Sequence, residues 1–133
     1  MTRYMLDTNT VSYLIRKHPL VSKRVMDVPM AALCISAITE GELLFGLEKL
    51  PGAKRLHVAV RELLLRVDVL PWDRATAACY GVERAKMEGK GKILGSLDLL
   101  IATHAQDVGA ILVTSDRAFG QVTGLLVEDW TLL

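Results

Sequence analysis

The sequence predicts an α/β fold in which a central parallel β-sheet is flanked by helices within a single domain. Short apolar runs without alternation recur along the chain, and such runs are typical of parallel strands covered on both faces. Stretches with helical apolar periodicity separate these runs. The length of 133 residues and the hydrophobic content of 51% suffice for one domain with a buried core and exclude a disordered chain.

Strands and helices are expected to alternate along the chain. We predict strands at residues 3–7, 32–36, 67–70, 110–113 and 125–127. We predict helices at residues 9–17, from about 21 to 29, 37–49, 53–66, from an N-cap at 73 to about 88, and 96–108. Pro19, Pro51-Gly52 and Gly109 stand where helices should end, since proline restricts the residue before it and glycine often follows a helix.

Composition narrows the classes of function. The formal net charge is only +1, so any contact with nucleic acid must use local basic clusters. No apolar run approaches the ~20 residues that span a bilayer. The first residues are too quickly acidic for a signal peptide, so we expect a cytoplasmic protein. Cys34 and Cys79 lie in apolar stretches and are expected to be reduced, buried hydrophobes.

Four acidic residues are candidates for one site. Asp7 and Asp116 follow predicted strands, and ligands of open α/β sheets bind beyond the carboxyl ends of strands. Glu42 and Asp98 lie in largely apolar helices. Each acid also has a purely structural alternative. Asp7 and Asp116 are suitable helix caps, Asp98 suits the helix dipole, and Glu42 follows Thr39 at the spacing of a capping box.

Taken together, the four acids favour a metal site. A carboxylate on an apolar face is costly unless it is paired, protonated or bound to a cation. Acids that share a pocket raise one another's pKa values, and a divalent cation removes this repulsion. An all-oxygen site suits Mg²⁺ or Mn²⁺. Such a site can hydrolyse a phosphodiester, and an acid that does not hold the metal could orient the water or act as general base.

Four sequence blocks surround these acids in order. They read Tyr-Met-Leu-Asp7-Thr-Asn9, then Ile35-Ser-Ala-Ile-Thr39-x-x-Glu42-Leu-x-x-Gly46, then Gly95-Ser-Leu-Asp98-Leu-Leu-Ile-Ala102, then Leu112-Val-Thr114-Ser-Asp116-x-x-Phe119. These blocks and the closing Glu128-Asp-Trp130 resemble the PIN domain family, and most closely its VapC-type toxins of bacterial toxin–antitoxin pairs. The resemblance covers residues 1–133 as one PIN domain.

The resemblance implies an activity and a division of roles. Asp7 and Asp98 match the family acids that usually bind Mg²⁺, for which Mn²⁺ can substitute. Glu42 and Asp116 match the other two acids of the catalytic cluster, and Asn9 matches the polar residue that commonly supports the first acid. The implied activity is a Mg²⁺-dependent endoribonuclease that cuts RNA, in several members tRNA, and so inhibits translation. The implied partners are a second copy in a homodimer and a VapB-type antitoxin that silences the toxin.

Two other interpretations remain open. A PIN-like module that binds RNA or a partner without cutting would be expected to lack one or more of the four acids, and all four are present. A phospho-acceptor signalling domain would need an acceptor aspartate at the third strand and a lysine beyond the last strands. Asp68 lies inside the third predicted strand, and no lysine follows residue 92.

Other side chains have weaker candidate roles. Lys90 and Lys92 belong to a basic loop that could contact RNA phosphates, although solvated loop lysines are common. Tyr13 could stack on bases, whereas Phe45 is expected in the core. His104 is expected to be structural rather than a general base, because the helical turn from Asp98 points it to a different side.

Overall fold

The computed structural model describes residues 2–133, which form one five-stranded parallel sheet with helices around it. The strands are β1 (Tyr4–Leu6), β2 (Leu33–Ser36), β3 (Asp68–Leu70), β4 (Ile111–Val113) and β5 (Val127–Glu128). The helices are α1 (Thr8–Ile15), α2 (Pro19–Asp27), α3 (Ala37–Lys49), α4 (Lys54–Arg66), α5 (Arg74–Gly89) and α6 (Ser96–Val108), with 3₁₀ turns η1 (Met30–Ala32) and η2 (Arg117–Gln121). The predicted α/β fold with a central parallel sheet is confirmed.

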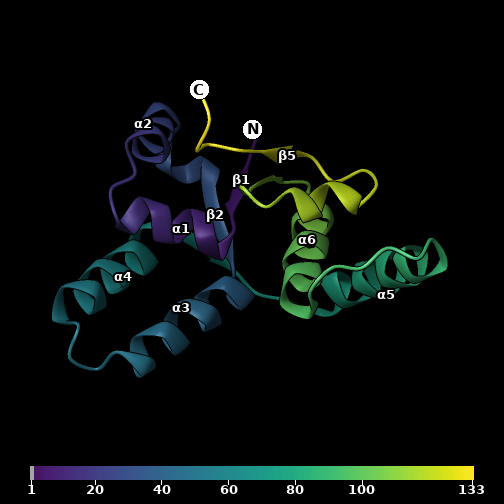
Figure 1. Ribbon diagram of the computed structural model, residues 1–133, viewed down its shortest axis with the longest axis horizontal. Coiled ribbons are helices and arrows are strands. Elements are labelled where there is room, and N and C mark those ends of the chain that lie inside the picture. Colours follow the sequence, from purple (N-terminus) through teal and green to yellow (C-terminus); the bar gives the residue numbers. More distant parts are fainter. Residues whose placement is uncertain (1) are drawn as a thin grey trace.

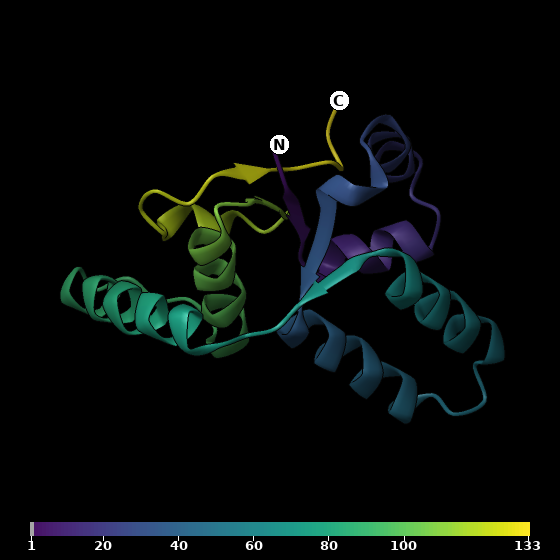
Figure 2. The ribbon, with the colours of Figure 1, turned by 180° about the vertical axis from the view of Figure 1, so that it is seen from behind.

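The strand order β3-β2-β1-β4-β5 places β1 at the centre of the sheet. Successive side chains point to opposite faces, and each face is covered by different helices. Met5 and Leu112 pack with α5, α6 and η2 in one core cluster. Leu6 and Val113 pack with α1 to α4 in the other. Figures 1 and 2 show α5 and α6 on one side of the sheet and α1 to α4 on the other. Burial on both faces explains why the strands read as apolar runs without alternation.

Side-chain caps fix where the helices begin. Asp7, Ser36 and Asp73 each accept a hydrogen bond from a backbone N–H in the first turn of α1, α3 and α5 respectively, which satisfies a donor that the helix itself leaves unpaired. Gly109 ends α6 in the left-handed region, with φ of 69°. The predicted cap at Asp73 and the predicted stop at Gly109 are confirmed.

Several boundaries differ from the prediction. The last strand covers Val127–Glu128 and not 125–127. The second helix begins at Pro19, because proline at the first helical position already has a helical φ. The proposed capping box between Thr39 and Glu42 is wrong. Ser36 is the N-cap of α3, so both residues lie inside the helix.

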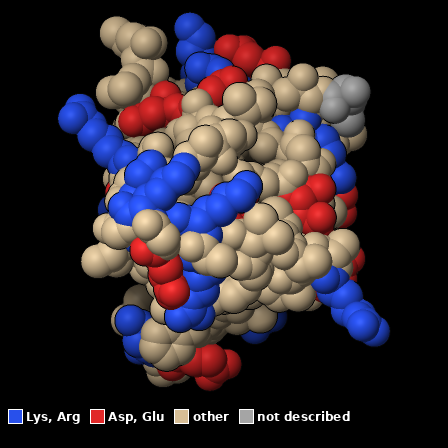
Figure 3. All heavy atoms as spheres, turned by 90° about the vertical axis from the view of Figure 1, so that its right-hand side faces the viewer, with Lys and Arg blue, Asp and Glu red and all other residues tan. Residues whose placement is uncertain are grey.

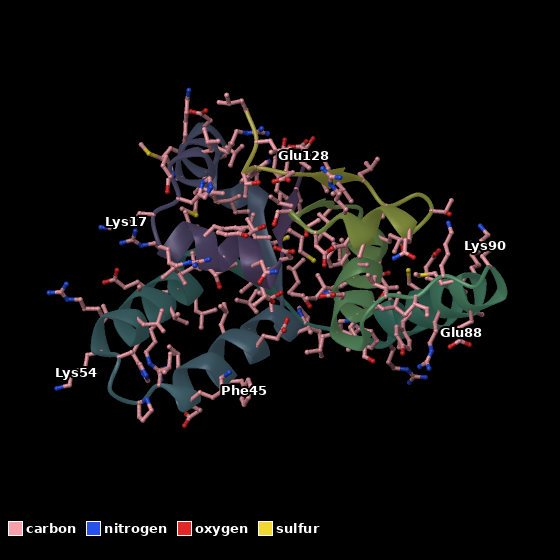
Figure 4. All side chains as sticks on the ribbon, in the orientation of Figure 1. Lys17, Phe45, Lys54, Glu88, Lys90 and Glu128 are labelled. Atoms are coloured by element: carbon pink, nitrogen blue, oxygen red, sulfur yellow. The ribbon has the colours of Figure 1, made fainter. Side chains whose placement is uncertain are left out.

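The prediction that Phe45 belongs to the core is also wrong. Its side chain is 63% exposed and lies on the outer side of α3 (Figure 4). Leu43 and Leu47 take the inward side of this helix, and a residue two positions from each of them must face another way. The Lys49 ammonium lies 5.0 Å from the centroid of the Phe45 ring.

Both cysteines are free. Burial raises the pKa of the Cys34 thiol to about 11, so this thiol stays protonated and unreactive near neutral pH. Cys79 is half-buried, not fully buried as predicted. Among the described residues, none of the helices has the length and apolar character needed to cross a membrane.

Candidate active site

The site lies where the chain changes direction across the sheet. From β1 the chain runs to β2 and β3 on one side and returns to β4 on the other side of β1. Ligands of open α/β sheets bind at this kind of switch point, beyond the carboxyl ends of the strands. Asp7 follows β1 directly, and Asp116 follows β4 after two intervening residues. The Asp7 backbone N–H donates to the Val113 carbonyl at 3.1 Å, which holds these two strand ends together.

A cleft of about 100 Å³ opens at this edge of the sheet. Its lining residues come from the start of α1, from α3 and from α6, and they are Asp7, Thr8, Asn9, Glu42, Asp98 and Ile101. Three of the four acids singled out in the sequence therefore meet at one cleft, together with the predicted polar neighbour. The fourth acid, Asp116, does not line the cleft. It caps η2 by accepting a hydrogen bond from the Ala118 backbone N–H at 2.9 Å.

Asp7 is both a helix cap and a buried acid. One of its carboxylate oxygens accepts a hydrogen bond from the Thr10 backbone N–H at 2.8 Å, and the residue is only 4% exposed. Burial raises the pKa of Asp7, while hydrogen bonds from Thr114 and Thr10 oppose this rise in part. The structural alternative for Asp7 is thus correct, but it does not account for a carboxylate held so deep beside other acids.

The four carboxylates interact electrostatically. Burial raises the pKa of Asp98, and the negative charges of Asp116, Glu42 and Asp7 raise it further. Asp116 therefore belongs to the same electrostatic cluster, although it stands outside the cleft wall. Glu42 is fixed by the Thr8 hydroxyl, which donates to its carboxylate at 2.6 Å.

No basic side chain neutralises this cluster within residues 2–133. The ion pairs of this part of the chain are Arg3–Asp68, Arg24–Glu128, Arg84–Glu88 and Lys86–Glu83. None of them includes any of the four acids. Acids that converge without a cationic partner are costly to ionise together, and a bound cation relieves that cost.

Comparison with known proteins agrees with the sequence blocks around the acids. Residues 4–125 match the PIN domain family. The chain belongs to the PIN domain family. It is 36% identical over 132 residues to the tRNA(fMet)-specific endonuclease VapC of Shigella flexneri, which covers 98% of this chain and 100% of that protein. This identity over nearly the whole length makes the chain a VapC-type PIN domain.

Solved structures support the same assignment. A chain of the crystal structure of DNA-bound VapBC from Salmonella typhimurium is similar to this PIN domain with a TM-score of 0.90 and 36% identity, covering 98% of this chain and 99% of that one. A chain of VapBC2 from Rickettsia felis, bound to a DNA fragment from its promoter, gives a TM-score of 0.88 and 32% identity. It covers 97% of this chain and 99% of that one.

The donor set of this PIN domain fits a hard divalent cation with a largely hydrated coordination shell. Within residues 2–133, no three His, Cys, Asp or Glu side chains are grouped so that they could hold a metal ion by themselves. Mg²⁺ does not require such a cage, because it is usually bound through one or two carboxylates and keeps several waters. Asp7 and Asp98, two acids with raised pKa values at one cleft, satisfy that requirement.

Sequence reasoning missed two hydroxyl residues of the site. Thr8 holds Glu42. Thr114 hydrogen-bonds the Asp7 carboxyl group, and its hydroxyl oxygen accepts from the Asp116 backbone N–H at 3.0 Å. Both threonines stand one or two positions from a predicted acid. Their proximity to the acids was the available signal, whereas the contact between Thr8 and Glu42 depends on how α1 and α3 pack.

Proposed function

We propose that this VapC-type PIN domain is a Mg²⁺-dependent endoribonuclease, with Mn²⁺ able to substitute, and that it acts as the toxin of a type II toxin–antitoxin pair by cutting RNA and inhibiting translation. The observation that carries the proposal is the cleft itself. Asp7, Glu42 and Asp98 reach it from three distant segments, and they have no ion-pair partner in the described part of the chain. The ribonuclease and tRNA endonuclease names of its VapC relatives support RNA, and tRNA in particular, as substrate.

The four acids have three proposed roles. Asp7 and Asp98 hold the metal ion. When bound, the ion lowers the pKa of a water molecule and stabilises the charge that develops on the phosphate. Glu42, oriented by the Thr8 hydroxyl, accepts the proton of the attacking water as general base. Asp116 keeps the cleft negative and is tied to Asp7 through Thr114.

RNA would be guided to the cleft by local basic residues, because the net charge of the chain is only +1. Lysine and arginine side chains gather on the face of the molecule on the side of α5 (Figure 3). Lys90 projects from the outer tip of α5 (Figure 4), and Lys92 follows in the loop that leads to Asp98. We assign these lysines to phosphate contacts, which supply most sequence-independent affinity for nucleic acid.

We also propose a partner, an oligomeric state and a cellular location for this protein. Its partner is a VapB-type antitoxin, supported by the VapBC complexes that it resembles. It forms a homodimer, as the family resemblance implies. It acts in the cytoplasm, where its RNA substrates are found.

The direct test is the substitution Asp7→Asn. Asparagine caps helices about as well as aspartate, so α1 should persist. RNA cleavage in vitro and growth arrest on expression should both vanish. Wild-type cleavage should stop in chelator and return with Mg²⁺ or Mn²⁺. Asp73→Asn, at another capping aspartate, is the matched control and should cleave normally.

Two outcomes would contradict the proposal. Undiminished cleavage by Asp7→Asn would remove the metal assignment. RNA that binds the wild-type protein but stays intact in both Mg²⁺ and Mn²⁺ would instead indicate a binding module without catalysis.

A further inference from the structure

A buried hydrogen bond joins the segments that carry Glu42 and Asp98. The Nδ1 atom of His104 lies 2.7 Å from the hydroxyl oxygen of Ser36. Both residues are 0% exposed, and they are 68 positions apart in the sequence. His104 therefore does not reach solvent or substrate, which excludes it as a general base. Its bond instead joins α6 to the residue that links β2 and α3.

Ser36 stands at the start of the helix that carries Glu42. It ends β2 and caps α3, since its hydroxyl oxygen accepts a hydrogen bond from the Ile38 backbone N–H at 3.1 Å. Glu42 follows six residues after Ser36, and His104 follows six residues after Asp98 on α6. At 1.5 Å per residue, the bond lies roughly 9 Å along the helix from each acid.

We propose that the hydrogen bond between His104 and Ser36 is a positioning contact that sets the separation of Glu42 and Asp98 across the cleft. The inference rests on the proposed nuclease function, because it assigns a role to that separation. It makes His104 a positioning residue, not a catalytic one.

The Ile38 side chain of α3 packs against the core cluster that contains α6. Apolar contacts are non-directional and fix the position of a helix less sharply than a hydrogen bond does. A buried hydrogen bond is directional, and leaving either partner unpaired costs its desolvation energy. Sub-ångström placement matters for catalysis, because an error of about 1 Å can lower a rate by ~100-fold.

The test compares three variants in α6 with the wild-type protein. His104→Leu removes the bond with little change of volume. His104→Asn keeps a polar atom near the position of Nδ1. Thr103→Val is the matched control, because Thr103 is also 0% exposed but its hydroxyl bonds the Leu99 carbonyl of its own helix at 2.9 Å. The readouts are kcat and KM for RNA, Mn²⁺ affinity by calorimetry without RNA, and Tm.

His104→Leu should lower kcat by about 10–100-fold, the scale expected when reacting groups are displaced by up to about 1 Å, and weaken Mn²⁺ binding with KM for RNA little changed. His104→Asn should recover most of both losses. Thr103→Val should lower Tm but keep the wild-type kcat and Mn²⁺ affinity. Should His104→Leu fail to fold, Ser36→Ala removes the same bond together with the cap of α3 and should lower kcat at least as much.

A folded His104→Leu or Ser36→Ala protein with wild-type kcat and Mn²⁺ affinity would overturn the inference. Equal losses in Thr103→Val would also overturn it, because they would trace to stability alone. Failure of the proposed function looks different, since the wild-type protein itself would then bind no Mn²⁺ and cut no RNA.

Discussion

Two aspartates in this protein cap helices in the same way, but the fold shifts their pKa values in opposite directions. Asp7 and Asp73 each precede a helix and are each followed three positions later by a threonine. The backbone N–H of that threonine donates to the aspartate at 2.8 Å in the first case and at 3.1 Å in the second. Yet burial raises the pKa of Asp7, whereas the hydrogen bond from the Thr76 backbone lowers the pKa of Asp73.

The surroundings explain the difference. Asp7 is almost fully buried at a cleft that it shares with Glu42 and Asp98, so its charge is poorly solvated. Asp73 is exposed to water, which stabilises its charge. The comparison teaches that the local pattern of aspartate and threonine determines where a helix starts. The tertiary fold determines whether the same carboxylate becomes part of a site.

The largest predicted effect is a difference in cleavage rate between substitutions at two acids of α6. Asp98→Asn should lower the rate of RNA cleavage by more than about 100-fold, because loss of a metal ligand exceeds the 10–100-fold effect of an outer-shell partner. Asp107→Asn, on the same helix, should cleave normally, since Asp107 only accepts a hydrogen bond from the Thr76 hydroxyl at 2.9 Å. Single-turnover cleavage assays would measure both rates. Equal cleavage rates in the two variants would show that Asp98 contributes no more to cleavage than Asp107 does.

A smaller difference in cleavage rate is expected between substitutions that remove two threonine hydroxyls. Thr8→Val removes the donor that holds Glu42 and should lower the cleavage rate by about 10–100-fold. Thr76→Val removes a buried hydroxyl that contacts Asp73 and Asp107. It should lower Tm and leave the rate per folded molecule unchanged. A loss of rate in Thr76→Val without unfolding would show that the acidic cleft is not the only region that controls cleavage.

The smallest effect concerns stability and pH in the absence of metal. Because the pKa of Asp7 is raised by folding, the folded state holds this proton more tightly than the unfolded state, and stability falls as pH rises above the ordinary value of 3.8. Asp7→Asn stays neutral, so at neutral pH it should raise Tm by up to a few degrees. This gain should disappear below pH 3.8.

The sign reverses for Asp73, whose pKa is lowered. Its stabilising contribution is present above 3.8 and is lost as pH falls through the folded pKa, so Asp73→Asn should not gain stability at neutral pH. Thermal unfolding in chelator between acidic and neutral pH would check both variants. A fall in Tm for Asp7→Asn at neutral pH would contradict the raised pKa of Asp7.

The sequence allowed the fold and the acids to be predicted for different reasons. The fold follows from apolar runs and from glycine and proline punctuation, which are local properties. Asp7 and Asp116 could be located because strand ends of a parallel sheet meet at one edge. The meeting of Glu42 with Asp98 required the packing of α3 against α6. The cost of carboxylates on apolar helix faces indicated a shared site, and the family resemblance placed both acids in one cluster.

The features that could not be predicted depend on which side chains of a helix face the core and which contact another segment. The sequence predicts Phe45 in the core, but Leu43 and Leu47 occupy the inward side of α3. The contact between Thr8 and Glu42, and that between Ser36 and His104, join residues far apart in sequence. Single hydroxyl groups carry no periodic signal that would reveal such pairs.

Calorimetric titration of the RNA-free protein with Mn²⁺ tests the central claim most directly, because it measures the ion's site apart from catalysis. The wild-type protein and Asp107→Asn should bind Mn²⁺ saturably, and Mg²⁺ should compete. Asp98→Asn should show no binding at the same concentrations. Binding by Asp98→Asn as tight as that of the wild-type protein, or no binding by the wild-type protein, would contradict the account.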